Sequence, residues 1–278
     1  RTMKKILYFL SPQYFDCLHT GITGFHRPAR TGNNSNRQSA PFPGQGIQPS
    51  ALGRVRARPF SGPLVAVLSA FMLLAGATAT AMAKTGLALF GSQEIRSQSL
   101  RTFPKWTGML ARNTIKTGAK PAVCKQGIVK NCVPGRWLEI VEQLRNHDRS
   151  TQINMVNKFI NGGDYALDSK NWGIDDYWAT PSQFLARDGD CEDFAIAKYL
   201  TLKWLGMNAA NMRIVVLQDR KRRTNHAVLA VYEENNIVIL DNLINRPMPA
   251  SAIHHYKPIF SINEEAWWLH MSKRSLDN

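Results

Sequence analysis

The sequence is poor in acidic residues. Its 278 residues include 20 Asp and Glu against 35 Lys and Arg, a net charge of +15 at pH 7. Residues 1–83 hold nine basic residues and one acid (+8), and residues 84–278 hold the other 26 basic and 19 acidic residues (+7). No nucleic-acid recognition motif accompanies this charge, so we expect no nucleic-acid partner.

The sequence also lacks an apolar run of the roughly 20 residues that a membrane-spanning helix needs. The longest run, residues 63–77, follows Arg54, Arg56 and Arg58 and leads to Ala81-Met82-Ala83. A basic start, a short apolar middle and small residues at the end are typical of a secretory signal peptide. We therefore expect residues 54–83 to be a signal peptide cleaved after Ala83, with an uncleaved anchor as the alternative. The protein is then periplasmic.

Residues 1–53 are rich in Gly, Pro, Asn, Ser and Arg, a composition typical of disorder. A signal peptide acts at an N-terminus. We therefore interpret these residues as disordered or as an untranslated segment upstream of the true start. Residues 84–278 are expected to form the folded domain.

Cysteine is scarce, with four residues in the chain. Cys124 and Cys132 lie in a segment rich in Gly, Lys and Pro, and no further Cys/His pair lies nearby to complete a zinc site. In an oxidising compartment the two could form a disulfide, and we expect that bond. The alternative is two unpaired or metal-binding thiols.

The order of predicted elements indicates an α+β fold, with helices first and strands afterwards. Apolar residues at helical spacing predict helices over 136–147 and 151–160. Thr180-Pro181-Ser182-Gln183 matches a capping box that starts a short helix, and a longer helix is expected over 190–205. Strands are expected over 213–217, 226–232 and 237–240, as an antiparallel sheet packed on the longer helix.

Cys191 stands at the start of that longer helix, in the segment RDGDCEDFA. The unpaired N–H groups and the dipole at a helix start favour a thiolate, as in cysteine nucleophiles. The alternative is a buried, inert cysteine. The neighbours Asp188, Asp190, Glu192 and Asp193 would be a poor shell for a buried apolar side chain.

A histidine and an aspartate border the last two predicted strands. His226 shares strand parity with Val228, and Asp241 shares it with Ile239, so both side chains should leave the same sheet face. With Cys191 they have the residue types of a nucleophile, its base and the acid that orients the base. Taken singly, His226 could be a structural histidine and Asp241 a turn former.

The segments DYWATPSQFLARDGDCEDFAIAKY, NHAVLA and IVILDNL resemble the bacterial transglutaminase-like cysteine proteinases, as does ALFGSQEIRSQSLRTFPKWTGML. The resemblance covers roughly residues 88–270. It implies a papain/transglutaminase-like fold, with Cys191 as nucleophile, His226 as base and Asp241 as orienting acid. The Cys191 backbone N–H would stabilise the oxyanion, and Trp178 is suggested as the second donor.

The same resemblance implies a calcium site on Asp190 and Glu192, with Asp193 a less certain ligand. Carboxylates beside Cys191 oppose its thiolate, and a hard cation that prefers oxygen ligands would neutralise them. The alternative is that these acids only stabilise the helix N-terminus.

The resemblance also implies a substrate and a partner. Such proteinases clip the N-terminal region of a large surface adhesin of the RTX type, which releases the adhesin during biofilm dispersal. An inner-membrane cyclic-di-GMP receptor would sequester the enzyme. The alternatives are a transglutaminase-like acyl transferase or amidase acting on another periplasmic substrate, and a non-catalytic periplasmic binding module.

Overall fold

The computed structural model describes residues 87–113, 123 and 134–272. The expected signal peptide, the segment before it and the Cys124–Cys132 bond lie outside these residues. Within the described part of the chain, no helix has the length and apolarity needed to cross a membrane.

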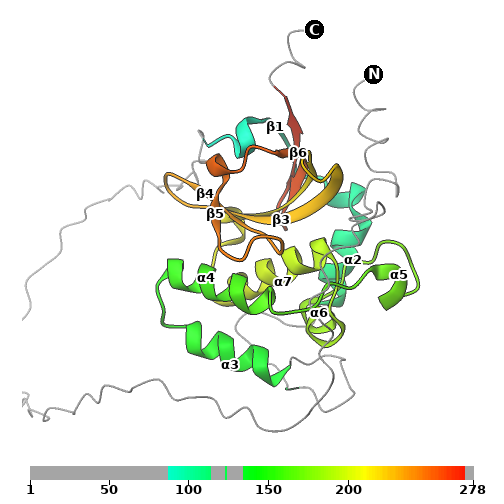
Figure 1. Ribbon diagram of the computed structural model, residues 1–278, viewed down its shortest axis with the longest axis vertical. Helices are drawn as coiled ribbons and strands as arrows, with labels where there is room; N and C mark the ends of the chain where they lie inside the picture. Colours follow the sequence, from blue (N-terminus) through cyan, green and yellow to red (C-terminus); the bar gives the residue numbers. More distant parts are fainter. Residues whose placement is uncertain (1–86, 114–122, 124–133, 273–278) are drawn as a thin grey trace, which may run out of the picture. The chain divides into compact units, whose positions relative to one another are not determined.

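Among the described residues, the α-helices lie on one side of the sheet (Figure 1). The α-helices are α2 (Pro104–Arg112), α3 (Gly135–Leu144), α4 (Arg149–Ile160), α5 (Asp168–Asn171), α6 (Pro181–Arg187) and α7 (Cys191–Trp204). The short 3-10 helices are η2 (Leu89–Gly91), η3 (Leu100–Thr102), η4 (Ala209–Asn211) and η5 (Ala250–Ala252), of which η2 and η5 contribute to the apolar cluster on the other sheet face. The expected capping box is present, because Thr180 and Gln183 bond each other's backbone N–H at the start of α6. This reciprocal bonding satisfies two N–H groups that would otherwise lack partners.

The sheet has seven strands in the order β1-β7-β6-β2-β3-β4-β5, and every pair is antiparallel. The strands are β1 (Gln93–Ser97), β2 (Met212–Asp219), β3 (Thr224–Tyr232), β4 (Ile237–Leu240), β5 (Met248–Pro249), β6 (Tyr256–Ile262) and β7 (Trp267–Met271). Helices followed by an antiparallel sheet confirm the expected α+β class. The three predicted strands correspond to β2, β3 and β4.

The helix α7 is the central helix of the fold. It packs on β2 and β3 on one side and on α4 and α6 on the other, which explains why nearly all its side chains are buried. It ends where Gly206 adopts φ +89° and the backbone N–H of Met207 bonds the Leu202 carbonyl at 3.0 Å. This arrangement is a Schellman motif, and glycine adopts its left-handed conformation without strain.

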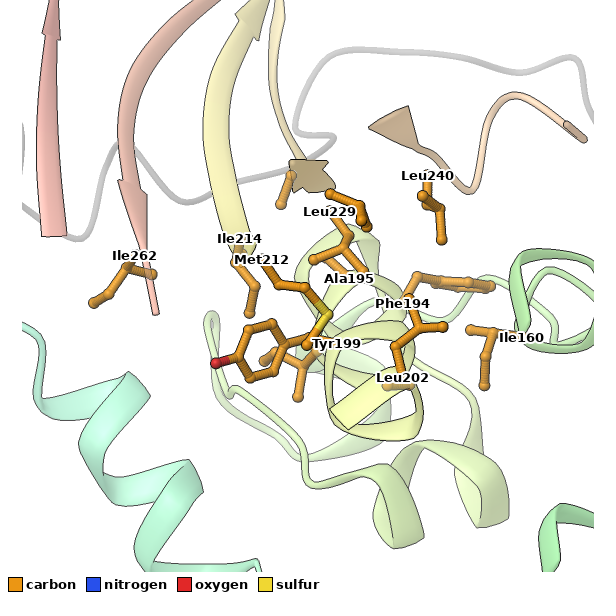
Figure 2. Close-up of a cluster of buried hydrophobic side chains, with 14 of the residues drawn as sticks. Ile160, Phe194, Ala195, Tyr199, Leu202, Met212, Ile214, Leu229, Leu240 and Ile262 are labelled. Carbon is orange, nitrogen blue, oxygen red and sulfur yellow. The ribbon is translucent and has the colours of Figure 1, made fainter. Parts of the chain in front are cut away.

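Apolar side chains fill the layer between α7 and the sheet (Figure 2). Phe194, Tyr199 and Leu202 of α7 belong to the same buried cluster as Ile214 of β2 and Leu229 of β3. A second cluster covers the opposite sheet face, where Val228 and Ile239 pack with Tyr256. Because both faces of the central strands are buried, β2 and β3 are almost continuously apolar.

Four strands of the sheet, β1, β5, β6 and β7, were not predicted. Pro258 interrupts the β6 segment, and it pairs with Leu217 beside a register shift in β2. Proline cannot donate to a ladder and is tolerated at such an irregularity. The tertiary pairing therefore overrides an unfavourable local sequence.

Replacing Leu202 tests the packing of α7. Its side chain is fully buried, so Leu202→Ala should lower the free energy of unfolding by about 2–5 kcal/mol through lost burial and a residual cavity. Met155→Ala on α4 is the control, since this side chain is 36% exposed. Chemical denaturation of both variants measures the difference. Equal losses would contradict the central position of α7.

Candidate active site

Cys191 is the first residue of α7, and Asp190 is its N-cap. The chain turns back between α7 and β2, and α7 packs on both β2 and β3. Hence α7 runs opposite to β2, and its first turn lies towards the end of the sheet where β3 begins. His226, near the start of β3, occupies that same end.

His226 and Asp241 form a buried hydrogen-bonded pair. The Nε2 atom of His226 lies 2.8 Å from Oδ1 of Asp241, and both residues are at most 4% exposed. The pair of Leu229 with Leu240 sets the register of β3 and β4, which places Asp241 beside His226 on one sheet face. The two side chains are therefore in contact, while their role in a triad and contact between the Cys191 sulfur and His226 stay predictions.

Asp241 is held by further hydrogen bonds. Its Oδ1 accepts from the backbone N–H of Leu243 at 2.8 Å, and its Oδ2 accepts from the Tyr256 hydroxyl at 2.5 Å. Burial raises the pKa of Asp241, but the adjacent His226 and the hydrogen bonds from His226, Tyr256 and Leu243 outweigh it. The pKa of Asp241 is therefore held well below its usual range. This carboxylate stays ionised, as an acid that orients a histidine must.

The loop after β4 is attached to α4 by two asparagines one helical turn apart. Nδ2 of Asn161 donates to the carbonyl of Asp241 at 2.8 Å, and Nδ2 of Asn157 donates to the carbonyl of Asn245 at 3.2 Å. These bonds fix the backbone that carries the acid. Asn157 is fully buried and Asn161 partly so.

A cluster of five acids surrounds the first turn of α7. Two groups have ligand atoms within 4.8 Å of one another. They share Asp168 and consist of Asp168, Asp176 and Glu192, and of Asp168, Asp190 and Asp193. The three acids expected from sequence therefore lie together.

Asp168 and Asp176 were missed by sequence reasoning. They lie in and after α5, in an irregular segment that carries no ligand spacing. The sequence offered a weak signal only, because Asp168 is an acid between the aromatic residues Tyr165 and Trp172. Asp176 also forms an ion pair with Lys105.

The buried acids resist ionisation. Burial, followed by the charge of Asp190, raises the pKa of Asp168 to about 7. The same two causes, in the same order, raise the pKa values of Glu192 and Asp193 well above their usual range. Oδ1 of Asp168 and Oδ2 of Asp193 are buried without a hydrogen-bond partner among the described residues. Clustered carboxylates with spare oxygens fit a hard divalent cation.

The loop before Cys191 is held from several sides. Asp188 has φ +61°, and its Oδ1 accepts from the backbone N–H of Asp164 at 2.9 Å. The backbone N–H of Ala166 donates to the Gly189 carbonyl at 2.9 Å. A left-handed conformation at a non-glycine residue is strained, so these contacts offset that strain and fix the approach to α7.

The sulfur of Cys191 lies beside a carboxylate. Sγ is 3.4 Å from Oε2 of Glu192. A nucleophile must be a thiolate, and a charged carboxylate at this distance opposes the thiolate unless it is neutralised.

Trp178, the suggested second oxyanion donor, is buried close to the acid cluster. Nη2 of Arg112 donates to its carbonyl at 2.7 Å. The backbone N–H of the next residue, Ala179, donates to Oδ1 of Asp193 at 2.7 Å. The segment is therefore fixed against α7, and its role as a donor stays a prediction.

The sequence profile of the family "Bacterial transglutaminase-like cysteine proteinase BTLCP" matches residues 122–275. Solved structures of Legionella pneumophila LapG are also similar. The calcium-bound form is 36% identical, covers 48% of this chain and 76% of its own, and has a TM-score of 0.45. The EGTA-treated form is 34% identical, covers 51% and 81%, and has the same TM-score of 0.45. No curated protein matches the chain.

Gly189 provides a test of the acid cluster. A Cβ added there would overlap Oδ2 of Asp193 and lie 2.7 Å from its Cβ. Gly189→Ala should therefore displace Asp193 and lower the melting temperature by several degrees, since strained or overpacked buried sites lose about 1–3 kcal/mol. In the control Gly135→Ala the nearest atom is a Val123 methyl at an ordinary 3.5 Å. Equal melting temperatures for the two variants would contradict the packing described.

Proposed function

The chain belongs to the bacterial transglutaminase-like cysteine proteinases, and we propose that it is a calcium-dependent periplasmic cysteine endopeptidase with Cys191, His226 and Asp241 as its triad. The observation that carries the triad is the buried 2.8 Å pair of His226 and Asp241. This pair stands at the end of the sheet towards which the first turn of α7 points. The exported location rests on the predicted signal peptide.

The chemistry follows from these roles. His226 accepts the proton of the Cys191 thiol, and the sulfur adds to a peptide carbonyl. When the carbon–nitrogen bond breaks, the imidazolium gives its proton to the leaving amine and a thioester remains. His226 then takes a proton from water, whose oxygen displaces the sulfur and releases the acid product. Asp241 keeps the imidazole oriented and stabilises its protonated form.

The start of α7 supplies the oxyanion site. The backbone N–H of Cys191 lies in the first turn of α7, where N–H groups point away from the helix body, and it would donate to the developing oxyanion. The second donor comes from the Trp178 segment, which the Arg112 bond and the Asp193 bond fix next to α7.

The proposed substrate is the N-terminal region of a large RTX-type surface adhesin, whose cleavage would release it from the cell. An inner-membrane cyclic-di-GMP receptor is the proposed regulator. Both follow from the family resemblance, which extends to LapG of Legionella at 36% identity over 76% of that protein. The shared motifs around Cys191 support them.

Acyl transfer to an amine is a second candidate, because the thioester formed on Cys191 can be attacked by an amine instead of water. An amidase acting on another periplasmic substrate would use the same three residues. A non-catalytic module is disfavoured, because a buried His–Asp pair with a strongly lowered carboxyl pKa has no evident use in simple binding.

We propose Ca²⁺ as the cation of the acid cluster. Asp190, Glu192 and Asp193 would supply oxygens from α7 and its cap, and Asp168 and Asp176 would supply them from the α5 segment. LapG of Legionella has been determined in a calcium-bound form. When bound, the ion would neutralise the carboxylates beside Cys191 and fix the α5 segment against α7.

Removing the nucleophile should abolish cleavage. We expect Cys191→Ala and His226→Ala, after reduction with dithiothreitol, to lose at least about 10³-fold of the wild-type rate, because triad members act as a unit. The assay incubates each protein with surface proteins of the source bacterium and identifies new N-termini by mass spectrometry. Product masses also separate hydrolysis from acyl transfer.

The exposed His147 in the loop between α3 and α4 provides the matched control, and His147→Ala should cleave like wild type. Circular dichroism should show that all variants are folded. Cleavage by Cys191→Ala within tenfold of wild type would disprove the triad.

Calcium should stabilise the protein more at pH 7 than at pH 5. The raised pKa of Asp168, about 7, means that the unfolded chain gives up this proton at a lower pH than the folded one. Without a cation, stability therefore falls as pH rises from about 4 towards 7. Bound calcium removes that penalty. Melting temperatures in EGTA and in excess Ca²⁺ at both pH values measure the effect.

Variants locate the cation. Asp168→Asn and Asp190→Ala should lose most of the calcium-induced rise in melting temperature, and Mg²⁺ should replace Ca²⁺ poorly because it demands stricter octahedral geometry. Asp175→Asn is the control, since this acid is exposed and outside the cluster. A full calcium effect in Asp168→Asn, or none in wild type, would reject the site.

A further inference from the structure

Tyr256 bonds the candidate triad acid on the side away from the histidine. Its hydroxyl donates to Oδ2 of Asp241 at 2.5 Å, while Oδ1 takes the bonds from His226 and Leu243. Tyr256 is the first residue of β6, and it is 3% exposed. The two oxygens of one buried carboxylate are thus bonded by groups from different strands.

We propose that Tyr256 is a positioning residue of the active site, which fixes the Asp241 carboxylate so that its other oxygen stays aligned with His226. The proposal rests on the proposed function for its catalytic meaning. A carboxylate can rotate about its terminal bond. Here the tyrosine bonds one oxygen, and a backbone N–H and an imidazole bond the other. Only one orientation of the carboxylate satisfies all three bonds.

The tyrosine is itself fixed by aromatic neighbours. Its ring meets His255 edge-on at a centroid distance of 4.5 Å and Phe90 at 5.7 Å. The Phe90 contact ties η2, near the start of the described chain, to the site. The Tyr256 ring also lines a cavity of about 430 Å³, which Phe90, Ile253 and His254 border as well.

The charged groups around this hydrogen bond come from each element packed against it. His226 lies on β3, Asp219 and Arg222 lie at the β2–β3 hairpin, and Lys198 lies on α7, where it acts electrostatically on Asp241. Burial and the charge of Asp241 raise the pKa of Tyr256 far above the physiological range. The hydroxyl therefore remains a donor wherever Asp241 is ionised.

Tyr256→Phe removes the donor and retains the ring. One hydrogen bond to a buried carboxylate corresponds to a pKa change of about one unit, so the carboxyl of Asp241 should titrate about one pH unit higher than in wild type. The titration is followed by ¹³C NMR of Asp-labelled protein, and Asp241→Asn assigns the resonance. This readout requires no substrate and no active enzyme.

A second readout addresses the catalytic role. The rate at which iodoacetamide alkylates reduced Cys191 is measured against pH. Cleavage sites are mapped separately by mass spectrometry. In Tyr256→Phe the acidic limb of this profile should shift upward, with about a three- to tenfold lower rate on that limb, because a less firmly oriented Asp241 stabilises the His226 imidazolium less. A merely structural tyrosine would change the melting temperature and leave the profile in place.

Tyr232→Phe is the matched control. Tyr232 belongs to the same buried cluster, and its hydroxyl has no hydrogen-bond partner among the described residues. This variant should match wild type in both readouts. An unchanged Asp241 titration in Tyr256→Phe, or an equal shift in Tyr232→Phe, would overturn the proposal.

The two proposals fail differently. If Cys191 reacts no faster than glutathione and His226→Ala makes no difference, the proposed function fails. The NMR titration still decides whether Tyr256 positions Asp241.

Discussion

Buried negative charge around the first turn of α7 is the constraint on which the rest of the structure depends. Five carboxylates converge there, and Asp193 is fully buried. Isolated buried charges are strongly unfavourable, so the acids must stay protonated or share a cation. Both outcomes require that the α5 segment and the start of α7 be held together, which the sheet and the core behind α7 accomplish. The position of Cys191, the first residue of α7, is thereby linked to the protonation of the acids.

The His226–Asp241 pair has the opposite electrostatic arrangement. Asp241 is as buried as Asp168, Glu192 and Asp193, yet its pKa is lowered and the pKa values of those three acids are raised. The difference lies in the partners: Asp241 meets an imidazole, a hydroxyl and a backbone N–H, whereas the cluster acids meet mostly one another. Burial alone therefore does not determine the protonation of a carboxyl group. The donors that accompany it do.

Local sequence signals predicted the parts of this site that depend on neighbouring residues. The capping box at Thr180, the helix that begins at Cys191 and the shared face of His226 and Asp241 follow from spacing, and the structure has them. Asp168 and Tyr256 could not be found this way. Asp168 reaches the cluster through an irregular segment, and Tyr256 reaches Asp241 only because β6 pairs with β2 across the sheet. No periodicity encodes such tertiary contacts, and the interior Pro258 makes β6 hard to recognise as a strand from sequence.

The asparagine side-chain bonds between α4 and the loop after β4 have a consequence for chemical ageing of the protein. Asn161 precedes Gly162, and an Asn–Gly pair is the dipeptide most prone to deamidation, through attack of the glycine nitrogen on the side-chain amide. Here that nitrogen is committed to the Phe159 carbonyl at 3.1 Å, and the amide donates to the carbonyl of Asp241. The folded chain thus protects the hydrogen bond from Asn161 that holds the backbone of Asp241. A molecule that unfolds, even briefly, exposes this pair, and the resulting aspartate would return as an acceptor facing a carbonyl.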